Sequence, residues 1–509
     1  MMGTLHECAR RGVPIIVFNP LRERALERFA DPQNAIEMGT LGSTRIASTY
    51  YQVKVGGDAA ALKGIMKALL AADRRAPGAI DHAFIAEHTN GFDAYIEDLD
   101  NTAWADIEQA CGLTQADLEQ VAAAYAKSKA AIVTYGMGIT QHARGTQNVQ
   151  QIAALLLMRG NFGRPGAGIC PLRGHSNVQG NRTVGITEKI DPVMFDNIEK
   201  TFGFRPPERH GHDAVDAMKA MASGYTRVLI CLGGNLAMAL SDTERCEAGM
   251  RRLQLAVHMN TKLNRSHLMI GRDAIILPVL GRTESDVQAT GAQSVTVEDS
   301  MSMVHASRGK LAPASEYLRS EPAIIAGMAA ATLPHTRVQW HYLVEDYGRI
   351  RDLIAKVYPD FRGYNERILK PGGFRLPLPP TERVWKTKSG KAEFLPFKGL
   401  QEDPGAVESG SLKLTTLRSH DQYNTTIYGL DDRYRGVFGR RDVLFMNTAD
   451  LARHGLEHGD AVDISTGLPG ESHRRLRLTA IAYDIAPGSV GAYYPCLLYT
   501  SPSPRDKRQ

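Results

Sequence analysis

Residues 135–185 contain ten glycines and no carboxylate, and this stretch constrains the fold more than any other part of the sequence. Amide, hydroxyl and guanidinium side chains are dense between the glycines. Glycine lets backbone N–H groups approach a ligand closely. Arginine, asparagine and glutamine supply planar donors that suit phosphates and planar heterocycles. The stretch therefore predicts an α/β protein whose glycine-rich turns bind a large polar ligand.

The bulk composition sets wider limits on the class of protein. A chain of 509 residues is too long for one hydrophobic core, so several domains are expected. The formal net charge is only +5 and no basic block stands out, which argues against a nucleic-acid partner. No apolar run is long enough to cross a membrane, so no membrane span is expected.

The six cysteines are isolated from one another. No two of them have C-x-x-C spacing, which argues against a zinc site or an iron–sulfur cluster held by this segment alone. Isolated thiols suggest a reducing compartment, and we expect a cytoplasmic protein. Cys170 adjoins the glycine-rich loops, but its Ile-Cys-Pro context is typical of a small buried residue. No metal ligand is assigned in this chain.

Residues 1–175 alternate strand-like and helical runs and are expected to form a first αβ domain. Ala59–Ala72 has the periodicity of an amphipathic helix, and Thr114–Lys127 is a second helix with Thr114 as its N-cap. Val13–Phe18 and Ala131–Tyr135 are predicted to be buried strands. Gly136 follows the second strand, at the sheet edge where ligands bind in open parallel sheets.

Residues 176–310 are expected to form a second αβ domain. Its predicted strands are Arg227–Leu232, Leu255–Asn260 and Ala274–Pro278, each followed by a loop. Residues 311–410 are expected to be an irregular crossover or linker region, because proline and glycine cluster near its end.

Residues 411–496 are β-rich, and we expect a truncated barrel there. Leu412–Leu417 alternates at period two, Ala461–Ile464 is another predicted strand, and Asn447–Asp460 is predicted to be a capped helix. Residues 497–509, with the run S-P-S-P-R-D-K-R-Q, have the composition of a disordered tail. This tail resembles translated sequencing-adapter read-through and is expected to be non-native.

Three pieces of the chain carry a family resemblance: Gly136–Gln141, the loop of residues 159–168, and Pro171–Gly180. With them, the chain from Met1 to about Pro495 resembles the molybdopterin oxidoreductase superfamily. Within it, the chain is similar to the formate-dehydrogenase-H-like branch that includes the "oxidoreductase alpha subunit" group.

The resemblance implies an architecture and a cofactor. The expected fold is α/β, with two Rossmann-like doubly wound αβα regions followed by an incomplete C-terminal six-stranded double-psi-type β-barrel. The implied cofactor is a molybdenum or tungsten bis(molybdopterin guanine dinucleotide), used for two-electron redox of a small substrate with an electron-transfer partner protein.

The resemblance also implies that the chain is a fragment. A cysteine-rich domain, with a 4Fe-4S cluster, and the Cys or selenocysteine ligand of the metal are expected upstream of Met1. The fragment itself is expected to bind cofactor poorly and to be inactive, whereas the intact parent would be an enzyme.

Arg173 and His175 are the catalytic residues that the resemblance implies. In the formate dehydrogenases an arginine in this position lies beside the substrate, where a guanidinium could hold a small anion bidentately. His175 could transfer a proton near neutral pH. A structural arginine and an ordinary loop histidine are the alternatives. An amide is expected where His175 stands in formate dehydrogenases, which puts formate itself in doubt as the substrate.

The implied cofactor-binding residues fall into five groups along the chain. The second-domain glycines could equally form a simple tight turn, and a polar hairpin loop is the less favoured alternative for the barrel residues. The five groups are Asn19 and Pro20; Gly136, Gly138, Thr140 and Gln141; Gly174, Asn177, Gln179 and Gly180; Gly233, Gly234 and Asn235; and His420, Gln422, Asn424 and Thr425.

Three other classes of protein are alternatives to this interpretation. A thiamine-diphosphate enzyme needs G-D-G, but alanine follows Gly57-Asp58, and no complete nicotinamide fingerprint is present. A non-catalytic scaffold subunit without metal remains an open alternative.

The segment Glu298–His305 resembles part of the same branch, but no mechanism follows from it, and its two acids could cap a helix.

Overall fold

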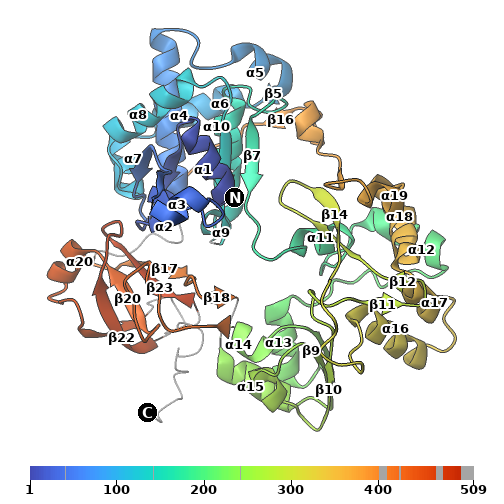
Figure 1. Cartoon of the computed structure of the whole chain (residues 1–509). Helices are drawn as coiled ribbons and strands as arrows, with labels where there is room; N and C mark the ends of the chain where they lie inside the picture. The colour runs from blue at the N-terminus through green and yellow to red at the C-terminus, as the bar shows by residue number, and fades with distance from the viewer. Residues whose placement is uncertain are drawn as a thin grey trace. The chain divides into compact units, whose positions relative to one another are not determined.

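A computed structural model describes residues 1–40, 42–141, 143–240, 242–400, 410–423, 426–465 and 474–494. The chain divides into two compact units, one made of Met1–Cys170 with Pro379–Gln509 and one of Pro171–Leu378. Figure 1 shows their helices and strands, and each unit is described by itself.

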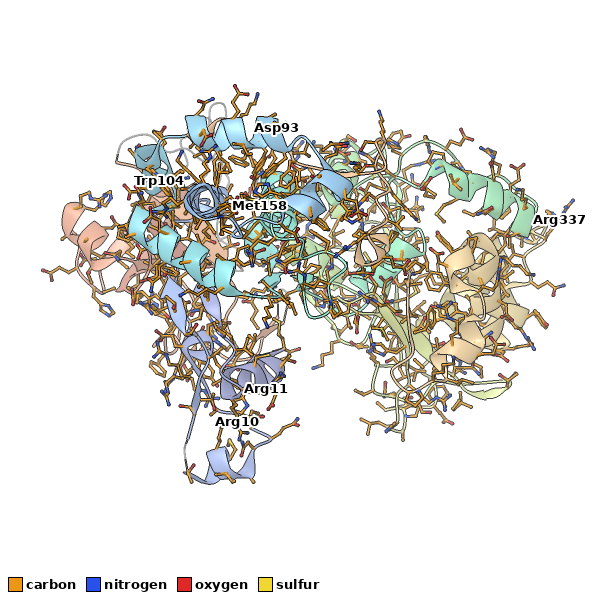
Figure 2. All side chains as sticks on the ribbon, turned by 90° about the horizontal axis from the view of Figure 1, so that it is seen from above. Arg10, Arg11, Asp93, Trp104, Met158 and Arg337 are labelled. Atoms are coloured by element: carbon orange, nitrogen blue, oxygen red, sulfur yellow. The ribbon has the colours of Figure 1, made fainter. Side chains whose placement is uncertain are left out.

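The first unit is built around α4, an 18-residue helix over Asp58–Arg75 that contains the predicted Ala59–Ala72. Helix α4 packs against α7, α8 and α10. An added Cβ on Gly64 would lie 2.5 Å from Cδ1 of Leu118 in α8, so glycine allows the two helices to pack closely. Figure 2 shows Met158, which is fully buried, among the side chains of these helices.

The cap predicted for the second helix is confirmed. Helix α8 covers Gln115–Lys127, and the side chain of Thr114 accepts a hydrogen bond from the backbone N–H of Asp117. The Asp117 carboxylate in turn accepts from the backbone N–H of Thr114 at 3.0 Å, which completes a capping box.

The two strands expected to be buried are shorter and more open than predicted. Strand β1 covers only Ile16–Phe18 and pairs in parallel with β4, Thr49–Tyr51. Strand β6 covers Ile132–Tyr135, and Ile132 is 58% exposed. Within the described residues, β6 pairs only with β7, Gly168–Pro171, so the prediction of a buried strand is wrong for β6.

The C-terminal part of the first unit is a mixed sheet with the strand order β17-β23-β20-β22-β21 in the described residues. Its core is apolar and includes Leu444, Leu478 and Ala492. The helix predicted over Asn447–Asp460 is wrong in length, because α20 covers Thr448–Arg453 and the chain then turns at Gly455, which has φ of +65°.

The remaining elements of the first unit are short. They are α1 (Met2–Arg10), α2 (Arg24–Glu27), α3 (Ala35–Thr40), α5 (His82–His88), α6 (Phe92–Asn101), α7 (Trp104–Cys111), α9 (Met137–Thr140), α10 (Gly145–Leu157), η3 (Pro379–Glu382), β2 (Arg28–Phe29), β3 (Thr44–Arg45), β5 (Thr89–Asn90), β16 (Ala392–Glu393), β17 (Lys413–Leu417), β18 (Gln422–Tyr423), β19 (Thr426–Ile427), β20 (Val443–Met446), β21 (Ala461–Ser465), β22 (Arg474–Ala482) and β23 (Ser489–Tyr493).

The second unit contains a parallel sheet of β8 (Val228–Leu232), β9 (Leu255–Asn260) and β10 (Asp273–Pro278), in the order β10-β9-β8. Helices α13 and α15 pack on one face, through a core that includes Met221 and Met250. On the other face Val228, Ile230 and Leu232 are 51%, 51% and 54% exposed. Parallel sheets are normally covered on both faces. This sheet differs, because one of its faces is open within the described residues.

A second sheet in this unit places the residues of the candidate site. Its antiparallel strands are β13 (Val295–Glu298), β14 (Met303–Ser307) and β15 (Phe374–Arg375). Helix α11, Val178–Thr183, packs against β13. As a result, the loop before α11 lies next to the turn between β13 and β14.

Residues 311–410 are more regular than expected, so the prediction of an irregular region is wrong for their first part. Helix α16 covers Glu321–Thr332, with Ser320 as its N-cap and a proline in its first turn. The alanine-rich run that follows this proline favours a helix. The other elements of the second unit are α12 (Pro192–Phe202), α13 (Ala214–Ser223), α14 (Leu236–Ala239), α15 (Thr243–Arg251), α17 (Trp340–Glu345), α18 (Tyr347–Val357), α19 (Tyr364–Ile368), η1 (Arg265–Leu268), η2 (Pro359–Phe361), β11 (Val287–Gln288) and β12 (Gly291–Ala292).

The mixed α/β fold predicted from the sequence is confirmed. The Rossmann-like and double-psi descriptions, and the domain boundaries, stay predictions.

Candidate functional site

A cavity of about 350 Å³ in the second unit brings together several residues that the sequence singled out. Its lining combines cationic, anionic and amide side chains, which is the composition of a site for a small polar ligand. The lining residues are Arg173, Gly174, His175, Ser176, Asn177, Gln179, Arg282, Val297, Glu298, Asp299, Ser300 and His305.

Asn177 holds the loop of this cavity in shape. Its φ is +66°, a left-handed conformation that asparagine tolerates better than most residues. Its Oδ1 accepts a hydrogen bond from the backbone N–H of Glu298 at 3.0 Å, and its Nδ2 donates to Oδ1 of Asn181 at 3.0 Å. The side chain predicted to bind cofactor therefore ties α11 to the end of β13.

The two glycines predicted in this group differ in their surroundings. An added Cβ on Gly174 would meet no atom within 4 Å, so the backbone there is open to a ligand. An added Cβ on Gly180 would lie 2.1 Å from Oδ1 of Asn177 and 3.1 Å from Cβ of Glu298. Gly180 thus lies behind the cavity wall, where it allows α11 to approach β13.

A chain of hydrogen bonds runs from Arg173 to Glu298. Nε of Arg173 donates to Oε1 of Gln179 at 2.9 Å, and Nε2 of Gln179 donates to Oε1 of Glu298 at 2.5 Å. Nε2 of Gln179 also donates to Oγ of Ser302 at 3.2 Å. Within the part of the chain that the structure describes, the two terminal nitrogens of Arg173 have no protein partner. They are therefore left for a ligand in the cavity.

Glu298 is the least expected member of the site. Its side chain is buried, with 5% of the residue exposed, and its Oε2 has no hydrogen-bond partner among the described residues. In the sequence, Glu298 lies in a segment that resembles the family, and its carboxylate was considered as a helix cap. That prediction is wrong, because Glu298 is the last residue of strand β13. Burying a carboxylate whose oxygen has no hydrogen-bond partner costs free energy. Buried charged groups of this kind are common at functional sites.

A second cation lies on another wall of the cavity. Nη1 of Arg282 donates to Oγ of Ser176 at 3.2 Å, and Nη2 donates to Oγ of Ser307 at 3.1 Å. These bonds fix the guanidinium beside the loop that carries His175. Arg282 was not predicted as a site residue, because it lies in no motif.

In the first unit, Gly136 and Gly138 lie at the carboxyl end of β6 and the start of α9. An added Cβ on either would meet no atom within 4 Å, so this turn could approach a ligand closely. Nδ2 of Asn148 donates to the carbonyl of Ile139 at 3.0 Å and fixes the turn that carries Thr140. Gln141 follows α9 and is exposed.

Asn19 and Pro20 follow β1 and take part in local structure. Oδ1 of Asn19 accepts from the backbone N–H of Leu21 at 3.4 Å. The carbonyl of Pro20 accepts from the backbone N–H of Ala486 at 2.8 Å, which ties this loop to the C-terminal sheet of the same unit.

Gly233, Gly234 and Asn235 lie where the parallel strand β8 ends. Both glycines have positive φ, +71° and +85°, and an added Cβ on either would meet nothing within 4 Å. Nδ2 of Asn264 donates to the carbonyl of Gly234 at 2.9 Å, and Oγ of Ser266 donates to Oδ1 of Asn235 at 3.2 Å. These residues form a tight turn that is also open to a ligand.

His420 and Gln422 are engaged within the first unit. Nδ1 of His420 lies 3.0 Å from Oδ1 of Asp432, which is fully buried. Oε1 of Gln422 accepts from the backbone N–H of Ser419 at 3.1 Å. Asn424 and Thr425, also predicted to bind cofactor, lie outside the described residues.

Asp432 is the centre of a buried polar cluster that the sequence did not reveal. Its Oδ2 accepts from Nη1 of Arg435 at 3.0 Å and from the hydroxyl of Tyr493 at 2.8 Å. Burial would raise the pKa of Asp432, but the hydrogen bonds of His420 and Tyr493 and the charge of Arg435 outweigh burial and hold that pKa below its usual range.

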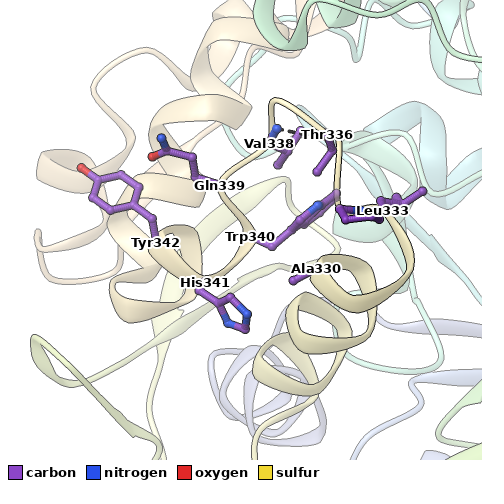
Figure 3. Close-up of a pocket in the computed structure, with 9 residues that line it drawn as sticks. Ala330, Leu333, Thr336, Val338, Gln339, Trp340, His341 and Tyr342 are labelled. Carbon is purple, nitrogen blue, oxygen red and sulfur yellow. Dashed lines mark hydrogen bonds between the residues drawn. The ribbon is translucent and has the colours of Figure 1, made fainter.

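A smaller cavity, of about 270 Å³, lies between α16 and α17. Figure 3 shows the Trp340 ring next to Leu333 on its wall. The lining residues include no carboxylate, lysine or arginine, so this cavity lacks the charged groups of the first one. The first cavity is the better candidate for the functional site.

Two further observations apply to the described ranges only. They contain no group of three or more His, Cys, Asp or Glu residues that could hold a metal ion. They also contain no helix that is both long and apolar enough to cross a membrane.

Two family models match the chain. The model described as "Molybdopterin oxidoreductase" matches residues 32–284, and the one described as "Molydopterin dinucleotide binding domain" matches residues 412–496. The chain belongs to the molybdopterin oxidoreductase superfamily. This confirms the resemblance inferred from the glycine-rich loops.

Relatives within the superfamily match almost all of this chain. Protein YdeP of Escherichia coli K12 is 52% identical over 503 residues, which cover 97% of this chain and 66% of YdeP. An uncharacterized oxidoreductase of Mycobacterium tuberculosis is 44% identical over 504 residues, covering 97% of this chain and 64% of the relative. The chain thus spans slightly less than two thirds of the length of these relatives.

Two more distant similarities set the limits of the comparison. A putative formate dehydrogenase of Staphylococcus aureus is 30% identical over 243 residues, covering 46% of this chain and 24% of that protein. The solved structure of acetylene hydratase from Pelobacter acetylenicus has a TM-score of 0.60 and 15% identity, covering 96% of this chain and 67% of that one. At this identity the match shows a shared fold alone.

Proposed function

We propose that this chain is part of the catalytic subunit of a molybdenum or tungsten bis(molybdopterin guanine dinucleotide) oxidoreductase, which carries out two-electron redox of a small substrate in the manner of a formate dehydrogenase. The observation that carries the proposal is the guanidinium of Arg173, held through Nε in a cavity with its terminal nitrogens left for a ligand.

The residues present fit a pterin dinucleotide. The turns at Gly136 and Gly138 and at Gly233 and Gly234 have open space where a side chain would be, so backbone N–H groups could approach phosphates or a heterocycle. The match to a molybdopterin dinucleotide binding domain at residues 412–496 supports the same ligand class. When bound, the metal centre of the cofactor would accept or supply the two electrons.

The side chains of this chain would bind and orient the substrate. The terminal nitrogens of Arg173 would hold a small planar anion through two parallel hydrogen bonds. His175 lines the same cavity, where an imidazole nitrogen could accept or return a proton near neutral pH. Gly174 leaves the room that a ligand needs between them.

Other parts of the interpretation stay predictions. They are the iron–sulfur cluster, the Cys or selenocysteine ligand, the electron-transfer partner and the cytoplasmic location. The substrate need not be formate, because the structure shows His175 in the cavity where the formate dehydrogenases are expected to have an amide.

The test is to express the complete reading frame that contains these residues in a host that makes the cofactor. We expect molybdenum or tungsten by elemental analysis, guanine nucleotide after acid hydrolysis, and dye-linked oxidation of formate or another small acid. Arg173→Gln should keep the metal and lose turnover, whereas Arg11→Gln, an exposed arginine of the first unit, should change neither. A protein without metal and nucleotide would instead support the non-catalytic scaffold.

A further inference from the structure

We propose that Glu298 determines which anions this cavity binds: through Gln179 it fixes Arg173, and its negative charge restricts the site to small anions of a single charge. This inference rests on the proposed role of Arg173. It adds a positioning and specificity-determining residue that no motif of the sequence assigned.

The first step concerns the orientation of the Gln179 amide. An amide can turn over and exchange its oxygen and its nitrogen. Here Nε2 must face the carboxylate of Glu298, at 2.5 Å, and Oγ of Ser302, at 3.2 Å, because these positions can accept hydrogen bonds. Oε1 is therefore turned toward Nε of Arg173, at 2.9 Å. With a neutral amide in place of Glu298, residue 298 could also donate to Gln179, and only Arg173 itself and Ser302 would hold the orientation of the Gln179 amide.

The second step concerns the guanidinium. Nε is one of five N–H donors that lie in one plane, so a bond at Nε fixes that plane. The backbone N–H of Arg173 also donates to Oγ of Ser300 at 3.3 Å, which holds the start of the side chain. The two terminal nitrogens are thus presented to the cavity as a pair, which suits a planar oxyanion.

The third step concerns charge. Glu298 is a wall residue of the cavity with 5% of its surface exposed, and its Oε2 has no partner among the described residues. Arg173 and Arg282 bring two positive charges to the lining of the cavity, and Glu298 and Asp299 bring two negative ones. An anion of one charge is attracted by the two exposed arginines, whereas a second charge is repelled by the buried carboxylate of Glu298.

The fixed position of Glu298 supports this role. Its backbone N–H donates to Oδ1 of Asn177 at 3.0 Å, and its Cβ lies 3.1 Å from where an added Cβ on Gly180 would be. The backbone and Cβ of Glu298 therefore cannot move without opening the contact between α11 and β13, and Gln179 holds its Oε1.

The experiment measures the binding of two inorganic probes, nitrate and sulfate, to the purified chain. Binding is followed through the ¹H–¹⁵N resonances of arginine Nε, which report on Arg173 without any enzymatic activity. We expect the chain to prefer nitrate. Glu298→Gln should lower the ratio of nitrate to sulfate affinity about tenfold, the size of one charged hydrogen bond, and should shift the Nε resonance of Arg173.

Three variants separate the possible outcomes. Gln179→Met should weaken nitrate binding but keep the preference, because the charge of Glu298 remains. Glu244→Gln removes an exposed charge from the same unit and should change nothing. Unchanged nitrate binding in Arg173→Gln would overturn the role of Arg173 itself. If that variant loses binding but Glu298→Gln keeps the preference, only the inference about Glu298 fails. If Glu298→Gln does not fold, Gln179→Met tests the hydrogen-bond chain from Glu298 to Arg173. An unshifted Nε resonance of Arg173 in Gln179→Met would overturn that chain.

Discussion

Replacing Asp432 by asparagine should loosen the C-terminal sheet of the first unit. Asp432 is fully buried, and its two oxygens receive three hydrogen bonds, from His420, Arg435 and Tyr493. An asparagine keeps the shape but offers one oxygen instead of two. Its NH₂ group can face only His420, whose Nδ1 would have to accept instead of donate, and Arg435 loses the negative charge of its partner.

The expected cost follows from the buried charge that remains. Removing one partner of a buried ion pair costs about 3–5 kcal/mol. Arg435 keeps a second partner, Oε1 of Glu23 at 2.6 Å. We therefore expect the low end, about 3 kcal/mol, which corresponds to roughly a hundredfold change in an opening equilibrium.

The effect should depend on pH in a defined direction. The pKa of Asp432 lies below its usual range in the folded chain, because hydrogen bonds and the charge of Arg435 outweigh the effect of burial. A carboxyl group with a lowered pKa stabilises the fold above its unfolded pKa, near 3.9, and loses this contribution as the pH falls through the folded pKa. The difference between wild type and Asp432→Asn should be full at pH 7 and shrink below about pH 4.

Hydrogen exchange read by mass spectrometry gives the result locally, which matters in a chain of two units. Peptides from β20 and β23 should exchange roughly a hundredfold faster in Asp432→Asn at pH 7. Asp442→Asn is the matched control, because Asp442 forms a partly exposed pair with Arg440 at 2.8 Å and should change exchange little. Exchange in β20 and β23 that changes less than threefold would show that the cluster does not hold the sheet.

Three further predictions concern other parts of the fold. Thr114→Ala removes the cap of α8 and should lower the unfolding free energy of the first unit by about 1 kcal/mol in a urea titration followed by tryptophan fluorescence; an unchanged midpoint would argue against the cap. Gly180→Ala places a Cβ 2.1 Å from Oδ1 of Asn177, so α11 should exchange faster and nitrate binding should weaken, and wild-type behaviour in both would contradict the close packing. Lys63→Met removes the buried ammonium that lies 2.8 Å from Asp98 and should lower the denaturation midpoint, with a cost of about 3 kcal/mol; a more stable variant would show that the ion pair is replaceable.

Local signals in the sequence were enough for several elements of the fold. Leu255–Asn260 was predicted as a strand with the bounds that β9 has, and Thr114 was identified as a cap from its own side chain and Asp117. The alanine-rich helix α16 was not predicted, because the region was assigned as irregular from the glycines and prolines that follow the helix in the sequence.

The chemistry of the site was only partly predictable. Arg173, His175 and Gln179 lie in one motif and line one cavity. Glu298 is 119 residues away from Gln179, and only the packing of α11 on β13 brings the two side chains together. Asp432 was missed for the same reason, because its partners come from separate parts of the chain.

The open face of the parallel sheet in the second unit has a practical consequence. Val228, Ile230 and Leu232 each expose about half of their surface on it, and Ile275 of β10 is 47% exposed on the same side. Contact of these side chains with water is unfavourable, and an exposed apolar patch favours binding to other molecules and aggregation. A preparation of this chain therefore calls for low protein concentration and a test of dye binding before any ligand titration is interpreted.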